Sequence, residues 1–443
     1  MSCSRCTLAD LLQAAGQALE ARRDLLGWTA VGRRLRGEQL FSGRRAIEAR
    51  RSIESDTVSL EVLCPSDGSA PPMCGAASVT LAAGEDPRPA IDFAVRAASR
   101  TRNPLYELPP PATMPDVPLD DPEISDLEET ALGLHQRLLS GAAADSEARL
   151  ALAEWFVERE EVRLVNSRGL EAHQTRSEIS LEWIVLAGDG DGRVETTLDL
   201  TRRRLADVDV ERLWSEVARQ TADRQRAGPA PMYEGPVVLR GRALATFLHS
   251  GTIATLASGR ARYAGFSHWE PGKSVFRGPV AGDPLTLWTS RVVPYGVHAG
   301  RFDSEGLPGQ RVLLIRDGVL QTYSAGQRYA TYLGVPATGA FGDIELPPGR
   351  TPQADLLADP HVEIIWWSWF SPNPTTGDFA SEIRLGYVVD GDRRTPFTGG
   401  LLIGNVLDGL ANVRWSAETG FFGDYAGPVT ARFASFRVTP SRD

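Results

Sequence analysis

The segment 372–413 constrains the fold more than any other part of the chain. It contains an apolar strand at 385–389, the turn D-G-D at 390–392 and a second strand, an order that is typical of a β-hairpin. A helix is predicted to begin near Asn405, because the apolar positions 406, 407, 410 and 413 share one helical face. A hairpin followed at once by an amphipathic helix indicates a mixed α+β domain.

Composition and charge exclude several classes of protein. The chain has 443 residues, enough for two or three domains, and its 42% apolar and 23% charged residues are ordinary for a globular protein. The longest apolar run, residues 364–370, is too short to span a bilayer. A formal net charge of −10 leaves no basic field for a phosphate backbone, so we expect neither membrane nor nucleic acid as a partner. The first residues lack the apolar segment of a secretory signal, and we expect a cytoplasmic location.

The local patterns divide the chain into three regions. Helices are predicted at 8–19 and 90–100 and a strand at 57–63, followed by seven prolines between 103 and 122 that rule out a helix or a central strand there. We place a boundary in this proline-rich segment. Helices at 123–139 and 208–226 then enclose strands at 148–156, 162–166, 179–186 and 194–198. The predicted domains are 1–122, 123–232 and 233–443, and the order of the early strands stays open.

Several ordered motifs carry a resemblance to a known family. T-G-D-F-A-S at 376–381, G-Y-V-V-D-G-D at 386–392 and G-N-V-L-D-G-L-A-N-V at 404–413 resemble the C-terminal domain of the TldD/TldE (PmbA) family, metalloproteases also called modulators of DNA gyrase. Upstream, D-S-E-G at 303–306, L-G-V-P-A-T-G at 333–339 and N-S-R-G at 166–169 match in the same order. The resemblance implies an N-terminal α/β region with a mostly antiparallel sheet and flanking helices, followed by a barrel-like β-rich domain.

The family's zinc motif is altered in this chain. Catalytic TldD-type members carry H-E-x-x-x-H on one helix, where two histidines bind zinc and the glutamate is the general base. The corresponding helix, predicted at 241–258, reads F-L-H-S-G-T-I-A-T-L: His249 stands alone, Ser250 replaces the glutamate, and Ile253 or a neighbour replaces the second histidine. The family's third ligand is a cysteine near the C-terminus, but no cysteine follows Cys74.

The resemblance therefore implies a TldE-type subunit without catalytic or metal-binding residues of its own. We expect no cofactor in this chain and zinc in a TldD-like partner that carries H-E-x-x-x-H, the two subunits forming a heterodimer that cleaves unfolded peptides. Ribosomally made precursor peptides are one such class. Two alternatives stay open: a homodimeric peptide-binding scaffold, and a divergent hydrolase that uses His298, Asp303 and Glu305.

Other candidate sites have structural interpretations that we favour. Asp303 and Glu305 are expected to accept backbone hydrogen bonds in a tight loop at Gly306. Cys3 and Cys6 form a single C-x-x-C, whereas a zinc ribbon normally has two. We therefore expect all four cysteines, including Cys64 and Cys74, to be reduced thiols.

The aromatic run 364–370 is a candidate for a core strand or a peptide groove. Alternation in a strand predicts Trp366 and Phe370 on one face and Trp367 and Trp369 on the other. The candidates for substrate or partner binding are His249, His298, Asp303, Glu305, Trp367, Trp369, Thr376, Gly377, Asp378 and Phe379.

Overall fold

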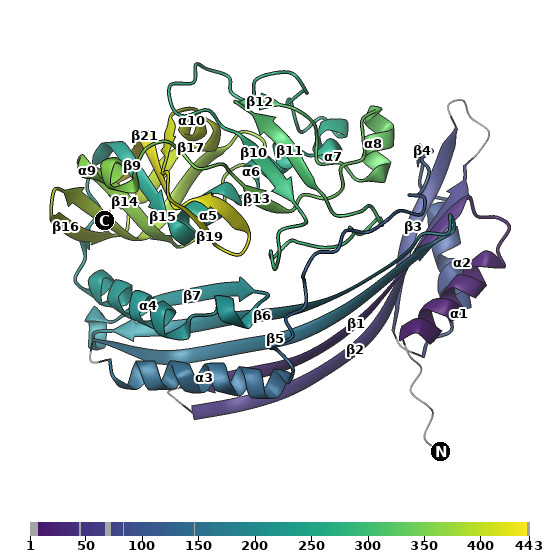
Figure 1. Cartoon of the computed structure of the whole chain (residues 1–443), viewed down its shortest axis with the longest axis horizontal. Helices are drawn as coiled ribbons and strands as arrows, with labels where there is room; N and C mark the ends of the chain where they lie inside the picture. Colours follow the sequence, from purple (N-terminus) through teal and green to yellow (C-terminus); the bar gives the residue numbers. More distant parts are fainter. Residues whose placement is uncertain (1–7, 44–45, 67–71, 83, 146, 441–443) are drawn as a thin grey trace.

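The computed structural model describes residues 8–43, 46–66, 72–82, 84–145 and 147–440, which form two parts (Figure 1). A long curved sheet with two pairs of helices makes up the N-terminal part, and a compact β-rich part lies over one side of it. This arrangement confirms the predicted α+β fold with an antiparallel N-terminal sheet and a barrel in the C-terminal region.

One seven-stranded sheet organises the N-terminal part, in the order β4-β3-β2-β1-β5-β6-β7. All of its neighbouring strands pair antiparallel. Because β1 pairs with β5, a single sheet spans the regions on both sides of the proline-rich segment. The strands are β1 Gly27–Gly43, β2 Ala46–Pro65, β3 Met73–Ala82, β4 Asn103–Pro104, β5 Ala148–Asn166, β6 Glu171–Ala187 and β7 Val194–Arg202.

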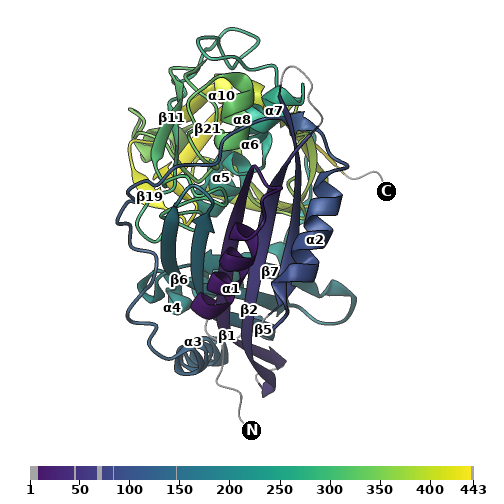
Figure 2. The same ribbon diagram turned by 90° about the vertical axis from the view of Figure 1, so that its right-hand side faces the viewer.

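Two helix pairs cover the same face of this sheet at opposite ends (Figures 1 and 2). Ala30 packs in the core beneath α1 and α2, and Leu40, on the same face of β1, packs in the core beneath α3 and α4. Val31 points the other way, toward Phe302 of the C-terminal part. Thr7 with Asp10 three residues on is the sequence pattern of a capping box at the start of the first helix, but Thr7 lies outside the described residues. The helices are α1 Leu8–Glu20, α2 Pro87–Ala98, α3 Leu127–Ala143 and α4 Val210–Gln225.

The proline-rich segment is a fixed bridge between the two parts. Tyr106, Leu108 and Leu119 are buried, although most of the segment has no regular structure. The Leu119 carbonyl accepts a hydrogen bond from the Ser177 amide of the sheet, at 3.2 Å. The Pro118 carbonyl accepts a hydrogen bond from the Tyr295 amide of the C-terminal part, at 3.0 Å. Backbone pairing on both sides fixes the segment even where prolines prevent a regular strand.

Strand β5 corrects one prediction. We expected two strands, at 148–156 and 162–166, but β5 is continuous. The charged stretch between them stays in the strand because its side chains pair across the sheet. Glu160, for example, contacts Arg33 of β1 at 3.1 Å and Arg176 of β6 at 2.7 Å. The turn at 166–169 lies between β5 and β6 as predicted, with Gly169 at φ 81°.

A closed five-stranded barrel forms the centre of the C-terminal part. The strands follow one another in the order β14-β9-β21-β17-β15, and β15 pairs with β14 to close the ring. The predicted hairpin is confirmed: β15 and β16 pair antiparallel on either side of the Asp-Gly-Asp turn. The strands are β9 Tyr233–Arg240, β14 His361–Trp367, β15 Asp378–Asp390, β16 Arg393–Thr398, β17 Leu401–Asn405 and β21 Thr430–Thr439.

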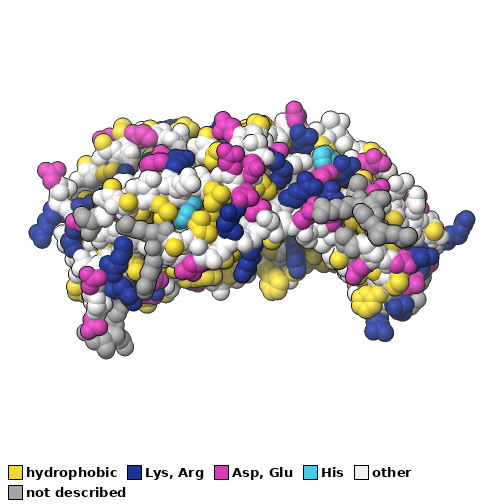
Figure 3. Space-filling view, turned by 90° about the horizontal axis from the view of Figure 1, so that it is seen from below, with side chains coloured by type: hydrophobic (Ala, Val, Ile, Leu, Met, Phe, Trp, Pro, Cys, Tyr) yellow, Lys and Arg dark blue, Asp and Glu magenta, His cyan; other side chains and the backbone are white. Residues whose placement is uncertain are grey.

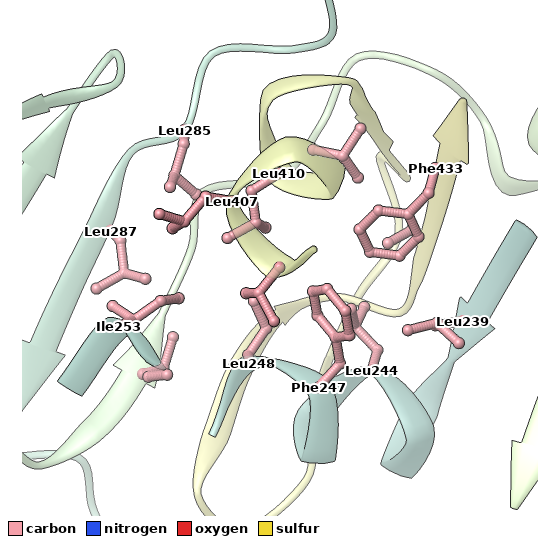
Figure 4. Packing of buried hydrophobic residues seen from close by; sticks show 14 of the residues in the cluster. Leu239, Leu244, Phe247, Leu248, Ile253, Leu285, Leu287, Leu407, Leu410 and Phe433 are labelled. Carbon is pink, nitrogen blue, oxygen red and sulfur yellow. The ribbon is translucent and has the colours of Figure 1, made fainter. Parts of the chain in front are cut away.

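A second sheet and six short helices pack around the barrel. Figure 4 shows Phe247, Leu407, Leu410 and Phe433 meeting in one buried cluster. The second sheet contains β10 Leu287–Ser290, β11 Arg311–Arg316, β12 Val319–Leu320, β13 Asp343–Glu345, β19 Thr419–Phe421 and β20 Tyr425–Pro428. The helices are α5 Gly241–Leu248, α6 Thr252–Leu256, α7 Gly259–Tyr263, α8 Gln327–Leu333, α9 Gln353–Ala358 and α10 Val406–Ala411. Among the described residues, no helix combines the length and apolarity needed to cross a membrane.

Candidate functional site

The helix that should carry the zinc motif is broken at the motif itself. We predicted one helix over 241–258, but α5 ends with His249 as its C-cap and α6 begins after Gly251. Gly251 has φ 95°, a left-handed conformation in which the helix cannot continue. The Ser250 hydroxyl group donates to the Phe247 carbonyl at 2.7 Å, and Ile253 is 1% exposed in the core (Figure 4). Neither position can present a ligand beside His249.

His249 nevertheless has two potential co-ligands from distant parts of the chain. His298 lies in the loop between β10 and β11, and Asp424 in the turn between β19 and β20. One ring nitrogen from each histidine and one oxygen of Asp424 all lie within 4.8 Å of one another. The two imidazole rings stack with their centroids 5.5 Å apart. We expected His249 to have no co-ligand, and this is true of its neighbours in the sequence. In the folded chain, however, His298 and Asp424 lie close enough to be co-ligands.

Hydrogen bonds hold this cluster in place. The His249 Nε2 atom lies 2.7 Å from the carbonyl oxygen of Asp424, which also accepts from the Ile344 amide at 2.9 Å. The His298 amide donates to Asp343 Oδ1 at 2.9 Å. The residues that precede His298 and Asp424 are bonded to each other as well: the Val297 amide donates to the Gly423 carbonyl at 2.9 Å. The backbones of the two loops are therefore joined.

Burial shapes the electrostatics around the cluster. Desolvation lowers the pKa of the His298 imidazole, and the nearby His249 acts in the same direction. Desolvation also raises the pKa of Asp343 to about 7. The second oxygen of this carboxyl group, Oδ2, is buried without a hydrogen-bond partner. Although His298 is exposed as a residue, desolvation of its ring favours the neutral imidazole, which is the form that binds metals.

The hydrogen bonds of Asp303 and Glu305 go to backbone amides outside this cluster. Asp303 Oδ1 accepts from the amides of Glu305 and Leu307, at 2.9 and 3.0 Å, and Oδ2 accepts from the Ala340 amide at 3.1 Å. Glu305 Oε2 accepts from the Arg328 amide at 3.1 Å. Asp303 therefore shapes the loop at Gly306, as we predicted, whereas Glu305 accepts from the backbone at the start of α8 and not within that loop.

The T-G-D-F motif supports the barrel wall. The Thr376 hydroxyl group and the Asn405 amide group each donate to Asp378, both at 2.8 Å, and lower the pKa of its carboxyl group. Gly377 has φ 83°, and Phe379 is buried in the core. Asn405 in turn caps α10, so the motif fixes the start of that helix. Thr376 and Asp378 also line a surface hollow of about 490 Å³.

The aromatic run lies beside a hollow between the two parts of the molecule. The predicted grouping of faces is wrong: Trp367 packs on Phe370 with ring centroids 4.7 Å apart, whereas Trp366 donates to Gln220 of α4. Irregular pairing of β14 with β15 at 364–367 breaks the simple alternation. Trp369 is 76% exposed. A hollow of about 250 Å³ is lined by Asp199, Arg242, Ala243, Thr246 and residues 365–370.

Comparison with known proteins identifies the family. Residues 118–227 match the PmbA/TldA metallopeptidase central domain, and residues 233–440 match the C-terminal domain of the same family. The chain belongs to the PmbA/TldD family. An uncharacterized protein of Methanocaldococcus jannaschii is 25% identical over 301 residues, covering 65% of this chain and 69% of that protein. A metalloprotease TldD homolog of Haemophilus influenzae is 26% identical over 224 residues, covering 46% of this chain and 45% of that protein.

A solved structure agrees with the fold of this PmbA/TldD family chain. The crystal structure of TldE from Thermococcus kodakarensis superposes with a TM-score of 0.80 and 17% identity, covering 98% of this chain and 99% of that one. The family's name implies a metal. In this chain the side chains of His249, His298 and Asp424 could bind a metal ion, since imidazole nitrogens and carboxylate oxygens are common zinc ligands. Sequence reasoning missed Asp424, because no spacing pattern links it to either histidine.

Proposed function

We propose that this chain is the non-catalytic, TldE/PmbA-like subunit of a heterodimeric TldD/TldE-type zinc metalloprotease. A TldD-like partner with H-E-x-x-x-H supplies the zinc and the general base, and this chain completes the chamber in which an unfolded peptide is bound. The observation that carries the proposal is the end of α5, where His249 is followed by Ser250 and by the left-handed Gly251. A zinc-binding helix of the H-E-x-x-x-H type cannot continue through the left-handed Gly251.

The hollow beside the aromatic run supports a role in peptide binding. Trp367 and Trp369 line this hollow together with Arg242 of helix α5 and Asp199 of the edge strand β7. Aromatic surface combined with a few charged groups suits an extended peptide better than a compact ligand. Ribosomally made precursor peptides belong to this class of substrate.

Charge and thiol chemistry agree with this assignment. The net charge is −10, and acidic and basic side chains are interspersed on the face shown in Figure 3, so a nucleic acid is not the proposed partner. Cys64 and Cys74 are buried free thiols, and burial raises the pKa of both. Free thiols suit a reducing compartment, and we place the complex in the cytoplasm.

The alternatives have weaker support. A divergent hydrolase using His298, Asp303 and Glu305 requires free carboxyl groups, but those of Asp303 and Glu305 accept backbone hydrogen bonds. A homodimeric scaffold would use the same aromatic hollow without a catalytic partner.

The test reconstitutes the complex from separately purified chains. We expect a one-to-one complex in native mass spectrometry and cleavage of an unfolded peptide only when both chains are present. Replacing the glutamate of the partner's H-E-x-x-x-H by glutamine should abolish cleavage while this chain is unchanged. Cleavage that survives that replacement, or cleavage by this chain alone, would overturn the proposal. A homodimer that ignores the partner would favour the scaffold.

A further inference from the structure

We propose that His249, His298 and Asp424 bind one divalent transition-metal ion of the zinc class, within this chain and independently of any partner. The ligands differ from the H-E-x-x-x-H set, because only His249 lies on the helix that would carry that motif and the other two come from loops. The inference does not rest on the proposed function, since it concerns binding of an ion by this chain alone.

The donor set has the composition of a three-ligand zinc site. Two imidazole nitrogens and one carboxylate oxygen lie within 4.8 Å of one another. Small side-chain rotations bring such atoms to the ~2.0–2.2 Å that zinc requires. Three protein ligands leave a fourth position for water, and the exposure of His298 gives an ion a route of entry.

The tautomer of His249 leaves a free nitrogen for the ion. Its Nε2 atom lies 2.7 Å from the Asp424 carbonyl oxygen. A carbonyl oxygen only accepts hydrogen bonds, so Nε2 carries the proton and Nδ1 keeps its lone pair. Hydrogen bonds of this kind from the second ring nitrogen to a carbonyl group orient metal-binding histidines generally.

Hydrogen bonds within the protein fix the ligand loops. Asp343 holds the His298 amide at 2.9 Å, and the Val297 amide is bonded to the Gly423 carbonyl at 2.9 Å. A preformed arrangement spares the ion the cost of ordering the loops.

The surrounding charge decides which class of ion fits. The guanidinium group of Arg202 interacts with Asp424, and those of Arg203 and Arg291 interact with Asp343. Their positive charges offset the negative charge of the two carboxylates. A magnesium or calcium site depends on several uncompensated carboxylates, whereas zinc, cobalt and nickel gain much of their affinity from imidazole. The cluster therefore favours a zinc-class ion over magnesium or calcium.

Metal binding to the full-length chain tests the inference. Cys3 and Cys6 are replaced by serine in every sample, so that thiols of the C-x-x-C do not contribute. The chelator-treated protein is dialysed against zinc and its metal content is measured. The visible absorption of added cobalt reports the ligands. We expect one zinc per chain, no displacement by excess magnesium, and a cobalt spectrum typical of nitrogen and oxygen donors.

Matched variants assign the ligands. His298→Ala and Asp424→Asn should each weaken zinc binding by at least about 100-fold, since even partners that only orient a ligand cost 10–100-fold. His268→Ala, at an exposed histidine outside the cluster, should leave binding unchanged. Circular dichroism confirms that each variant is folded, and Asp424→Asn keeps the size of the side chain in case His298→Ala does not fold. Absence of saturable zinc binding, or zinc retained at full stoichiometry by both ligand variants, would overturn the inference.

Discussion

The Tyr387 hydroxyl group, on barrel strand β15, donates a 2.6 Å hydrogen bond to Asp223 of helix α4. Burial, together with this bond to Asp223, raises the pKa of Tyr387, so the phenol stays a donor across the physiological range. The Arg394 guanidinium group lies 3.4 Å from the centre of the same ring. Tyr387 thus ties the barrel to the helical layer of the N-terminal part.

Removing this hydroxyl group should loosen the attachment. We expect Tyr387→Phe to lower the free energy of unfolding by about 1–2 kcal/mol, because the ring still packs but a hydrogen bond to a carboxylate is lost. Asp223 keeps a contact with Arg226 at 3.2 Å, which limits the loss. Urea denaturation measures the effect. Tyr263→Phe, at a tyrosine that is 46% exposed, is the control, and an equal change in both variants would contradict the assignment.

Asp303 should contribute to stability and not to catalysis. Asp303→Ala leaves the amides of Glu305, Leu307 and Ala340 without their acceptor, so the free energy of unfolding should fall by about 1–3 kcal/mol. The control is Asp392→Ala in the exposed hairpin turn. If Asp303→Ala instead abolished peptide cleavage by the complex while the melting temperature stayed the same, the divergent-hydrolase alternative would gain support.

Glu305 should make stability depend on pH. Its pKa is raised to about 7, chiefly by burial, whereas a glutamate in the unfolded chain has a pKa of about 4.3. Between these values the folded state keeps a proton that the unfolded state has released. Stability therefore falls as pH rises through this window and levels off above about pH 7.

The variant Glu305→Gln should flatten this dependence by about 1–3 kcal/mol between pH 4.5 and 7.5. Asp303 and Glu61, which face the same group and also have raised pKa values, leave a residual slope of the same sign, and Arg328 opposes it. Unfolding free energies at several pH values measure the effect, with Glu234→Gln at an exposed position as the control. An unchanged slope in Glu305→Gln would show that Glu305 is ionised in the folded state.

Local patterns predicted those elements whose residues contact one another along the chain. The Asp-Gly turn between β15 and β16, the face of α1 and the turn at Asn166 depend on a few neighbouring residues, and all three are present. Asn166 shows why such turns are readable: its own side chain accepts from the Arg168 amide at 2.9 Å, a bond that the local sequence alone dictates.

The remaining features depend on residues far apart in the chain. Closure of the barrel requires β14 to pair with both β9 and β15, which no local pattern encodes. The cluster at His249 needs Asp424, a residue 175 positions away whose carbonyl group also accepts from the His249 ring. The helix break at Gly251 was missed because a single glycine inside an apolar helical pattern is usually tolerated.

Trp369 should bind the peptide if the hollow is part of the substrate chamber. Trp369 lines the hollow and is 76% exposed, so Trp369→Ala should cost little stability. In the reconstituted complex we expect the KM for an unfolded peptide to rise about tenfold, the loss typical of removing an aromatic anchor, while kcat stays the same. Phe266→Ala is the matched control, because Phe266 is 66% exposed after α7, away from the hollow. Initial rates over a range of peptide concentrations separate the two constants. A KM unchanged in Trp369→Ala, or raised equally in Phe266→Ala, would mean that the peptide binds elsewhere.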